Sequence, residues 1–238
     1  MPTRLPPLRR PPIAFAHRGA RAHAPENTLE AFTLAVRLGA TGLESDVWLT
    51  RDGEAVLDHD GVLGGRLRRR PIAACDRADL PAHIPTVAEL YDAVGTDLDI
   101  SLDVKDPNAF DRTVAVARAA GGGALERLWL CYPRWERVVE WRKTCTDVRL
   151  VDSTFLGYMA NGPEERAAVL ADAGIDAVNL HHTEWTGGLT ALFHRFGVLC
   201  FGWDAQHERI LDGLLDAGID GVYSDHVDRM VDALRRAQ

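Results

Sequence analysis

Short apolar runs alternate with longer segments of helical periodicity along almost the whole chain. The runs are rich in Val, Ile, Leu and Phe, and apolar residues recur every three or four positions in the segments between them. This alternation is typical of β/α units around a parallel sheet. It predicts strands near 13–17, 42–48, 97–104, 127–132, 148–153, 177–181, 198–203 and 221–224. It predicts helices near 28–38, 86–94, 109–120, 134–143, 163–173, 188–195, 206–217 and 227–236.

The number of these units indicates the fold class. Eight strands, each followed by one helix without a long linker, favour a single (β/α)8 barrel over two smaller domains. Thr28 stands where a helix N-cap is expected, and Gly39, Gly174 and Gly218 stand where helices should end. We therefore expect a barrel over residues 12–238, preceded by a flexible, proline-rich segment at 1–11.

One excursion interrupts the regular alternation, between the second strand and its helix. Residues 54–58 predict a short additional strand after the Asp52-Gly53 turn. Residues 60–83 are polar, rich in arginine and weakly patterned. The sequence therefore predicts a short extra strand and a small insertion at this point of the barrel.

Composition and charge narrow the classes of partner. The chain has 238 residues, 46% of them hydrophobic and 26% charged, which is the composition of a globular protein. Its net charge of −8 repels nucleic acid, so we expect no nucleic-acid partner, and any phosphate chemistry must use local charge. A basic run is predicted to be a solvated loop rather than a nucleic-acid site, and this loop could guide an anionic substrate. It comprises Arg66, Arg68, Arg69 and Arg70.

Other features bear on the compartment. The chain lacks a stretch of the roughly 18 apolar residues that a membrane helix needs, and its start lacks the apolar stretch of a signal peptide. We therefore expect no transmembrane segment and a cytoplasmic location. The four cysteines are widely spaced without a C-x-x-C pair, which predicts reduced, mostly buried thiols. They are Cys75, Cys131, Cys145 and Cys200.

Three carboxylates at predicted strand ends are candidate metal ligands. Glu44 and Asp46 are two positions apart, so in a strand both side chains point to the same side. Asp103, on the next strand, is the natural third carboxylate. If this side is the barrel interior, the negative charges need a cation, and a hard divalent ion suits oxygen ligands. The pair taken alone favours outward-facing salt bridges slightly over a metal site.

Two histidines and two cations complete the candidate chemistry. Cleavage of a phosphodiester needs one group to take a proton and another to give one, and imidazole titrates near neutral pH, so His17 and His59 are candidates. Arg18 and Lys105 would neutralise phosphoryl oxygens or simply pair with the acidic cluster. Trp203 would form an apolar wall for the alcohol part of a substrate, or else belong to the core.

The stretch from His17 to Asp60 closely resembles the signature of the glycerophosphodiester phosphodiesterase family. It contains, in order, HRG, PENT, an acidic pair on the second strand and an HD after a hairpin. Further pieces fall in the family's order along the chain: IPTVAEL from Ile84, D-V-K at Asp103–Lys105, the tryptophan of FGWDAQ and GIDGVYSD ending at Asp225. The resemblance spans nearly the whole chain and is sparse between Asp106 and Val198.

The resemblance implies a (β/α)8 barrel, one divalent metal ion and hydrolysis of glycerophosphodiesters to sn-glycerol 3-phosphate and an alcohol. The metal would be Mg²⁺ or Ca²⁺, with Mn²⁺ as a further candidate. By this likeness His17 and His59 match the acid/base pair, and Glu44 and Asp46 match two metal ligands. Arg18 and Lys105 match the cations that contact phosphate. The substrate's own glycerol hydroxyl is expected to attack the phosphorus and form a cyclic phosphate.

Departures from the family pattern leave alternatives open. Asp103 stands where most members have Glu, and in this it resembles sphingomyelinase D-like enzymes, which leaves the substrate undetermined. A lysophospholipase D or sphingomyelinase D-like activity is the first alternative, and it would require an exposed hydrophobic rim. The second is a non-catalytic barrel that binds a metal or ligand. His181, His182 and Glu184 either line the pocket or face solvent. The sequence leaves the oligomeric state undetermined.

Overall fold

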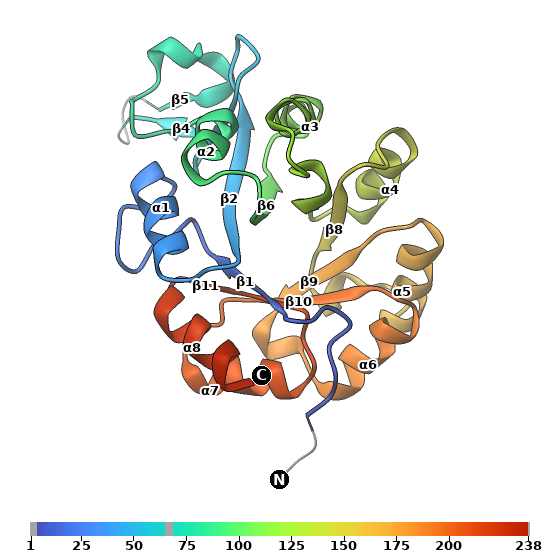
Figure 1. Cartoon of the computed structure of the whole chain (residues 1–238). Coiled ribbons are helices and arrows are strands. Elements are labelled where there is room, and N and C mark those ends of the chain that lie inside the picture. The colour runs from blue at the N-terminus through green and yellow to red at the C-terminus, as the bar shows by residue number, and fades with distance from the viewer. Residues whose placement is uncertain (1–3, 65–68, 238) are drawn as a thin grey trace.

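The computed structural model describes residues 4–64 and 69–237, and here eight parallel strands close into a barrel (Figure 1). Closure occurs at β1, which pairs with both β2 and β11. Around the barrel the strands are β1 (Ile13–Ala16), β2 (Gly42–Leu49), β6 (Asp99–Val104), β7 (Leu128–Tyr132), β8 (Arg149–Ser153), β9 (Ala177–His181), β10 (Leu199–Trp203) and β11 (Gly221–Ser224). The predicted (β/α)8 barrel is confirmed.

The helices of the described chain surround the barrel, as the sequence pattern predicts. They are α1 (Leu29–Arg37), α2 (Val87–Val94), α3 (Ala109–Ala120), α4 (Trp135–Thr144), α5 (Pro163–Asp172), α6 (Gly187–Arg195), α7 (Glu208–Asp216) and α8 (Val227–Ala237). The Thr28 hydroxyl caps α1 by accepting a hydrogen bond from the Ala31 backbone N–H. Gly39, Gly174 and Gly218 follow their helices with φ of 97°, 70° and 84°, a left-handed conformation that favours glycine.

The insertion between β2 and α2 has more structure than its sequence pattern indicated. The predicted extra strand is present as β3 (Ala55–Leu57), antiparallel to β2. Beyond it lie the hairpin of β4 (Val62–Leu63) and β5 (Arg70–Pro71) and two short 3₁₀ helices, Ile72–Ala74 and Arg77–Asp79. The insertion has its own small apolar cluster, made of Val56, Ile72, Cys75, Leu80 and Ile84. Of the basic run, Arg69 and Arg70 are exposed, and Arg66 and Arg68 lie outside the described residues.

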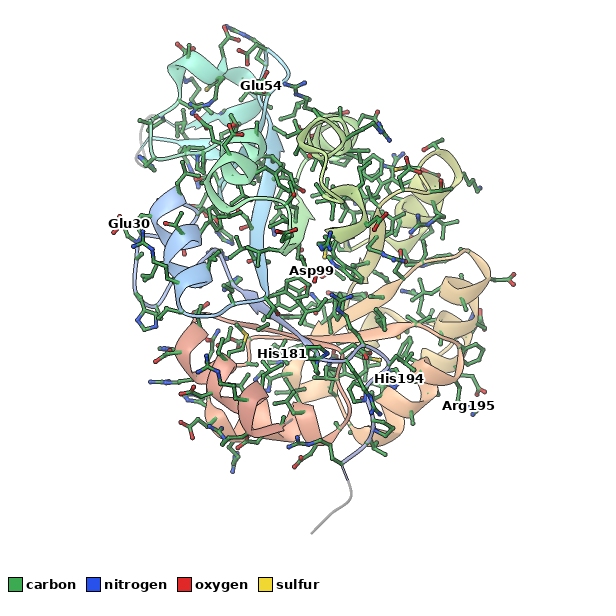
Figure 2. All side chains as sticks on the ribbon, in the orientation of Figure 1. Glu30, Glu54, Asp99, His181, His194 and Arg195 are labelled. Carbon is green, nitrogen blue, oxygen red and sulfur yellow. The ribbon has the colours of Figure 1, made fainter. Side chains whose placement is uncertain are left out.

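The described part of the N-terminal segment lies against the barrel end opposite the strands' carboxyl ends. The Arg9 guanidinium donates to the carboxylate of Asp99, labelled in Figure 2, at 2.6 Å, and the Arg9 backbone N–H donates to Asp220 at 2.8 Å. Asp99 also accepts a hydrogen bond from the Trp129 indole at 2.7 Å. These contacts connect the segment to the floor of the barrel.

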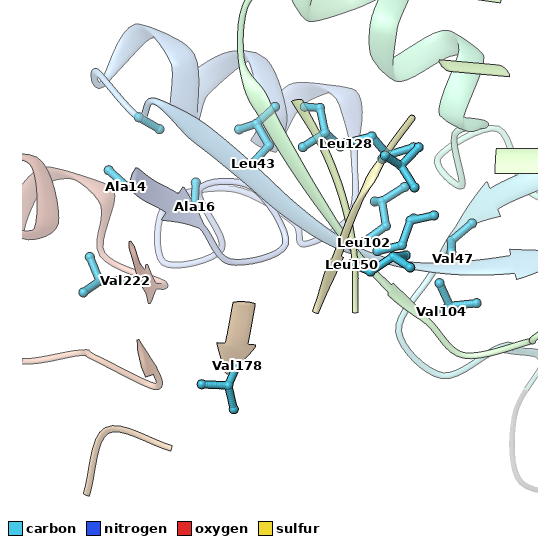
Figure 3. Close-up of a cluster of buried hydrophobic side chains, with 14 of the residues drawn as sticks. Ala14, Ala16, Leu43, Val47, Leu102, Val104, Leu128, Leu150, Val178 and Val222 are labelled. Atoms are coloured by element: carbon cyan, nitrogen blue, oxygen red, sulfur yellow. The ribbon is translucent and has the colours of Figure 1, made fainter. Parts of the chain in front are cut away.

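Strand parity divides the apolar residues into two layers. Residues such as Leu43, Leu102 and Val178 point outward and pack beneath the helices (Figure 3). The inward residues form a separate cluster that fills the lower barrel, made of Ile13, Phe15, Trp129, Cys131, Val151, Ala177, Phe201 and Tyr223. The interior is therefore filled at its floor, and the polar positions near the strands' carboxyl ends surround a cavity.

Two further expectations concern the membrane and the thiols. Within the described residues, no helix combines the length and apolar character required to cross a bilayer. All four cysteines are buried, as predicted. Cys200 and Cys131 lie on barrel strands, where burial raises the pKa of both thiols well above the usual value.

Candidate active site

A cavity of about 430 Å³ opens at the carboxyl ends of the barrel strands. This is the face on which (β/α)8 barrels carry their chemistry. The lining of the cavity includes seven of the eight residues predicted from the sequence to form the site, all except His59. The residues that line it are His17, Arg18, Arg21, Glu44, Asp46, Asp103, Lys105, Ser153, Thr154, Phe155, Asn179, Trp203, Asp204, Gln206 and Tyr223.

Three carboxylates converge on one side of this cavity. Asp46 and Asp103 are register partners on β2 and β6, and Glu44 lies two residues earlier on β2. Oxygens of all three carboxylates lie within 4.8 Å of one another. Glu44 and Asp46 are buried, and the buried Asp46 Oδ2 has no hydrogen-bond partner among the described residues. The shared side predicted from the two-residue spacing is confirmed, and it is the side that lines the cavity.

Crowding of these acids shifts their protonation. Burial raises the pKa of Glu44, and the charges of Asp46 and Asp103 raise it further against the opposing effect of His17. Burial likewise raises the pKa of Asp103, although Lys105 lowers it. Such shifts indicate that the carboxylate set has less positive charge around it than three ionised acids need.

Lys105 and Arg18 supply the nearest positive charge. Lys105 Nζ lies 2.9 Å from Asp46 Oδ1 and 3.4 Å from Asp103 Oδ2. Burial lowers the pKa of Lys105, but the charges of Asp103 and Asp46 outweigh this and raise it. Arg18 Nε lies 3.6 Å from Asp46 Oδ2. Both predicted phosphate-contacting cations therefore border the carboxylates and line the same cavity.

The loop after β1 contains both the HRG and the PENT motifs, and contacts between the two motifs fix its conformation. Gly19 has φ of 78°, and a Cβ there would lie 2.8 Å from the Ala31 backbone, so α1 approaches the loop closely. The Asn27 backbone N–H donates to the Arg18 carbonyl oxygen, and its side-chain oxygen accepts from Ser45 on β2. The loop thereby directs the Arg18 backbone N–H onto the Glu44 carboxylate at 2.9 Å.

His17 is oriented by Asp225, a contact that the sequence analysis did not predict. Its Nδ1 lies 2.5 Å from Asp225 Oδ1, and its Nε2 lies 3.8 Å from Glu44 Oε2. Burial lowers the pKa of His17, but the charge of Glu44 and the hydrogen bond to Asp225 outweigh it, so the pKa is raised. A carboxylate at Nδ1 fixes the tautomer and leaves Nε2 available inside the cavity.

His59 lies on the turn after β3 and outside the cavity lining. Its side chain is 40% exposed, and its Nδ1 lies 2.8 Å from Asp60 Oδ1. The preceding backbone N–H, of Asp58, donates to the Asp46 carbonyl oxygen, so the turn follows directly from the β2–β3 pair. Gly61 packs against the Trp48 indole, where a Cβ would lie 2.4 Å from the ring.

The sequence analysis missed polar residues on the far side of the cavity, because it considered each residue separately from the strand that carries it. Asn179 and Ser153 are register partners near the ends of β9 and β8, with the inward parity of the lower core. Gln206 accepts a hydrogen bond from the Asp225 backbone N–H at 2.9 Å. Strand-end parity, applied to all eight strands, would have identified Asn179 and Ser153, whereas Gln206 lies on a loop that the pattern does not orient.

The histidines at the end of β9 do not line the cavity. His181, labelled in Figure 2, places its Nε2 3.3 Å from Asp204 Oδ2 and packs against Trp203 with ring centroids 4.5 Å apart. Glu184 accepts a hydrogen bond from the Leu156 backbone N–H. Trp203 and Asp204, rather than these residues, contribute this wall of the cavity.

Further groups of His, Cys and acidic residues occur in the described chain, but they differ in chemistry from the carboxylate cluster. One combines His194 and Cys200 with Asp220, whose carboxylate already accepts hydrogen bonds from the Cys200 and Arg9 backbones. The set of Glu44, Asp46 and Asp103 presents oxygen ligands alone, which suits a hard divalent cation.

Comparison with known proteins decides the family. Residues 17–229 match the model of the glycerophosphoryl diester phosphodiesterase family. The chain belongs to this family. Its members are phosphoric diester hydrolases, and the match begins at His17 and extends into α8.

Relatives of this family span nearly the whole chain. A probable glycerophosphodiester phosphodiesterase 2 of Mycobacterium tuberculosis is 28% identical over 93% of this chain and 90% of its own. The glycerophosphodiester phosphodiesterase of Caldanaerobacter subterraneus subsp. tengcongensis is 23% identical over 94% of this chain and 98% of its own.

Solved structures share the barrel. One is a glycerophosphoryl diester phosphodiesterase, described as putative, from Silicibacter pomeroyi, with a TM-score of 0.84 and 21% identity over 96% of this chain and 95% of its own. Another is an Oleispira antarctica phosphodiesterase in complex with the product sn-glycerol-3-phosphate, with a TM-score of 0.81 and 22% identity over 94% of this chain and 97% of its own. At these identities the likeness concerns the fold.

Proposed function

We propose that this protein is a divalent-metal-dependent glycerophosphodiester phosphodiesterase, which hydrolyses its substrate to sn-glycerol 3-phosphate and an alcohol. The observation that carries the proposal is one cavity in which three carboxylates, two cations and a carboxylate-oriented histidine meet. Family membership and the product bound by the Oleispira antarctica relative support it. The substrate is a small molecule, in keeping with the size of the cavity.

The residues of the cluster fit a divalent metal ion. Asp46 Oδ2 is buried without a hydrogen-bond partner among the described residues, and the neighbouring Glu44 and Asp103 have raised pKa values. Glu44, Asp46 and Asp103 would hold Mg²⁺, Ca²⁺ or Mn²⁺ through oxygen ligands. Such an ion would supply positive charge to phosphoryl oxygens and lower the cost of bringing the three acids together.

Proton transfer is assigned to His17 and His59. Asp225 holds His17 through Nδ1, so that Nε2 faces the reacting groups from inside the cavity. His59 stands on the turn that returns past Asp46, held there by the β2–β3 pairing. One histidine takes a proton from the attacking glycerol hydroxyl while the other gives one to the departing alcohol oxygen, and water then opens the resulting cyclic phosphate to sn-glycerol 3-phosphate.

Arg18, Lys105 and Trp203 complete the substrate site. The guanidinium of Arg18 and the ammonium of Lys105 border the carboxylates, where they can donate hydrogen bonds to phosphoryl oxygens and neutralise the charge that builds on them. Trp203 lines the opposite wall, where its ring would contact the apolar part of the substrate.

The rim of the cavity favours water-soluble diesters over lipids. Among the described large hydrophobic residues, four are exposed, and two of these, Phe155 and Tyr158, lie on the cavity side after β8. The other two, Leu5 and Leu8, belong to the N-terminal segment. Two side chains give a smaller apolar surface than insertion into a bilayer requires.

Release of the head-group alcohol from a panel of glycerophosphodiesters and lysophospholipids tests the proposal, with sn-glycerol 3-phosphate as the second product of the diesters and lysophosphatidate as that of the lysophospholipids. The protein is assayed with EDTA and then with Mg²⁺, Ca²⁺ or Mn²⁺ added back. We expect release from soluble diesters only when a metal is present. Release from lysolipids alone would favour a phospholipase D-like activity, and silence across the panel with every metal would contradict a catalytic role.

A further inference from the structure

A second group of side chains with metal-binding atoms lies across the barrel from the three clustered carboxylates. It comprises His181, which ends β9, His182, which follows it, and Asp204, which follows β10. We call these three residues the β9 group. The closed strand order places β9 and β10 opposite β2 and β6, which carry the carboxylates. The two groups are therefore separate.

The binding atoms of the β9 group converge. One nitrogen or oxygen from each of its three residues lies within 4.8 Å of the other two. His181 Nε2 lies 3.3 Å from Asp204 Oδ2. Ligand atoms held tetrahedrally at about 2.0–2.1 Å from a zinc ion lie about 3.3–3.4 Å from one another. The distance between His181 and Asp204 therefore already matches that of two ligands on one ion.

Hydrogen bonding within the protein accounts for only part of this arrangement. At the observed distance, His181 and Asp204 can share a hydrogen bond. His182 packs beside them, with its ring centroid 4.3 Å from that of His181. It is half-buried, and neither of its ring nitrogens has a hydrogen-bond partner among the described residues. An imidazole placed in this way can supply the third ligand to an ion.

The other ring nitrogen of His181 has a partner of the kind that metal-binding imidazoles use. His181 Nδ1 lies 2.7 Å from the Thr183 hydroxyl oxygen. A neutral imidazole that donates its Nδ1 proton to this hydroxyl keeps a lone pair on Nε2, the atom that faces Asp204. Such an outer contact fixes both the tautomer and the orientation of a ligating histidine.

Another group in the described chain has the same ligand types and serves as a comparator. It consists of His23, His226 and Asp228. Two of its three members are exposed, whereas both imidazoles of the β9 group are half-buried. Water competes less strongly for partly buried ligands, so the β9 group is the better site.

We propose that His181, His182 and Asp204 form a second metal site, which binds a divalent transition-metal ion such as Zn²⁺ and takes neither Mg²⁺ nor Ca²⁺. Two imidazoles and one carboxylate suit such ions, whereas the acids on β2 and β6 present oxygen ligands alone. The ion joins the end of β9 to the loop after β10. It thereby fixes the wall of the cavity that Trp203 and Asp204 contribute.

Co²⁺ is a direct probe, because its visible absorption is intense in tetrahedral sites with nitrogen ligands and weak in octahedral oxygen sites. The untagged full chain is titrated with Co²⁺ in saturating Mg²⁺, which occupies the carboxylates. We expect an intense band that saturates at one equivalent and is lost when Zn²⁺ is added. Absence of the band, or its loss when the Mg²⁺ concentration is raised further, would overturn the proposal.

Variants assign the band to its ligands. His182→Gln and Asp204→Asn should each weaken Co²⁺ binding by at least about tenfold. Asparagine tolerates the left-handed φ of 62° at position 204, so Asp204→Asn removes the charge without straining the loop. Circular dichroism checks the fold. His23→Gln and Glu44→Gln should leave the band unchanged. Loss of the band in His23→Gln, or unchanged affinity in His182→Gln, would overturn the assignment.

Thermal unfolding gives a second readout that needs no substrate and is therefore independent of the proposed function. An ion that binds only the folded protein stabilises it by mass action. In saturating Mg²⁺ we expect Zn²⁺ at roughly 100 times its Kd to raise Tm by at least about 4 °C. The rise should be lost in His182→Gln and retained in His23→Gln. An equal rise in His182→Gln would contradict the site.

Discussion

His17 Nδ1 lies 2.5 Å from Asp225 Oδ1, and this contact joins the first strand of the barrel to the loop after the last. The strands meet because Ala16 and Ser224 are register partners where the barrel closes. Barrel closure therefore assembles the oriented histidine from the two ends of the chain.

Asp225→Asn is expected to shift the pH profile of the reaction. The Asp225 hydrogen bond and charge favour the protonated imidazole, so their removal lowers the pKa of His17. The limb of the kcat/KM profile that belongs to His17 should therefore move to lower pH, whichever proton step it performs. We also expect kcat/KM to fall by about 10- to 100-fold. Asp228→Asn is the control, because Asp228 forms an exposed pair with His23. An unshifted profile would contradict the claim that Asp225 raises the pKa of His17.

Loss of either candidate histidine should reduce turnover without unfolding the protein. We expect His17→Ala and His59→Ala each to lower kcat by at least about 100-fold, the contribution of a general acid or base. Stopped assays at saturating metal give kcat, and circular dichroism checks the fold. His83→Ala, at an exposed site in the insertion, should retain turnover. Near-normal kcat in His59→Ala would exclude it from the mechanism.

Neutral replacements of the carboxylates should weaken metal binding. Glu44→Gln and Asp46→Asn each remove one negative charge from the cluster, so we expect metal affinity to fall by at least about tenfold, with partial rescue of activity at excess metal. Isothermal titration with Mg²⁺, Ca²⁺ and Mn²⁺ measures this. Glu54→Gln is a matched control, because Glu54 is paired with Arg112 outside the cavity (Figure 2). Unchanged affinity in Glu44→Gln would require another ligand.

The pair of Arg166 and Asp152 supports the barrel away from the reaction. Arg166 Nη1 lies 2.7 Å from the fully buried Asp152 carboxylate, and burial raises the pKa of Asp152 to about 6 although Arg166 lowers it. Arg166→Met leaves that carboxylate buried without a cation, so we expect the free energy of unfolding to fall by about 3–5 kcal/mol at pH 8.

The loss in Arg166→Met should depend on pH. Removal of Arg166 raises the pKa of Asp152 further, so the folded variant takes up a proton that its unfolded state does not bind until lower pH. The destabilisation is therefore full above the folded pKa and decreases as pH falls through it. Urea unfolding at pH 8 and pH 5 measures the difference. Arg118→Met, which breaks an exposed pair with Asp147, should cost less than about 1 kcal/mol at both values. A pH-independent loss in Arg166→Met would contradict this account.

The barrel could be predicted because the same sequence signals recur along the chain. Every described barrel strand and helix begins and ends within two residues of the predicted limits, since apolar periodicity recurs in each unit and glycine follows six of the eight described helices. The insertion was less predictable. Its β4 and β5 strands are two residues long, too short for a periodic pattern, and its apolar cluster joins residues far apart in the chain.

The candidate site was predicted in part for a similar reason. The spacing of Glu44 and Asp46 fixes a shared side within one strand, and register brings Asp103 beside them. Contacts across the barrel leave no pattern in the neighbouring sequence. The hydrogen bond of Asp225 with His17 and the ring contact of Phe155 with Trp203 therefore appeared only in three dimensions. The role of His59 stays a prediction, because it lies outside the cavity lining.

Phosphorus-31 NMR of glycerophosphocholine with the metal-loaded protein tests the central claim most directly, because it identifies which bond to phosphorus breaks. We predict that the diester resonance is replaced by that of sn-glycerol 3-phosphate, and that the His17→Ala variant at the same metal concentration leaves the diester unchanged over the same period. Appearance of phosphocholine in place of sn-glycerol 3-phosphate, or equal conversion by the His17→Ala variant, would contradict the account.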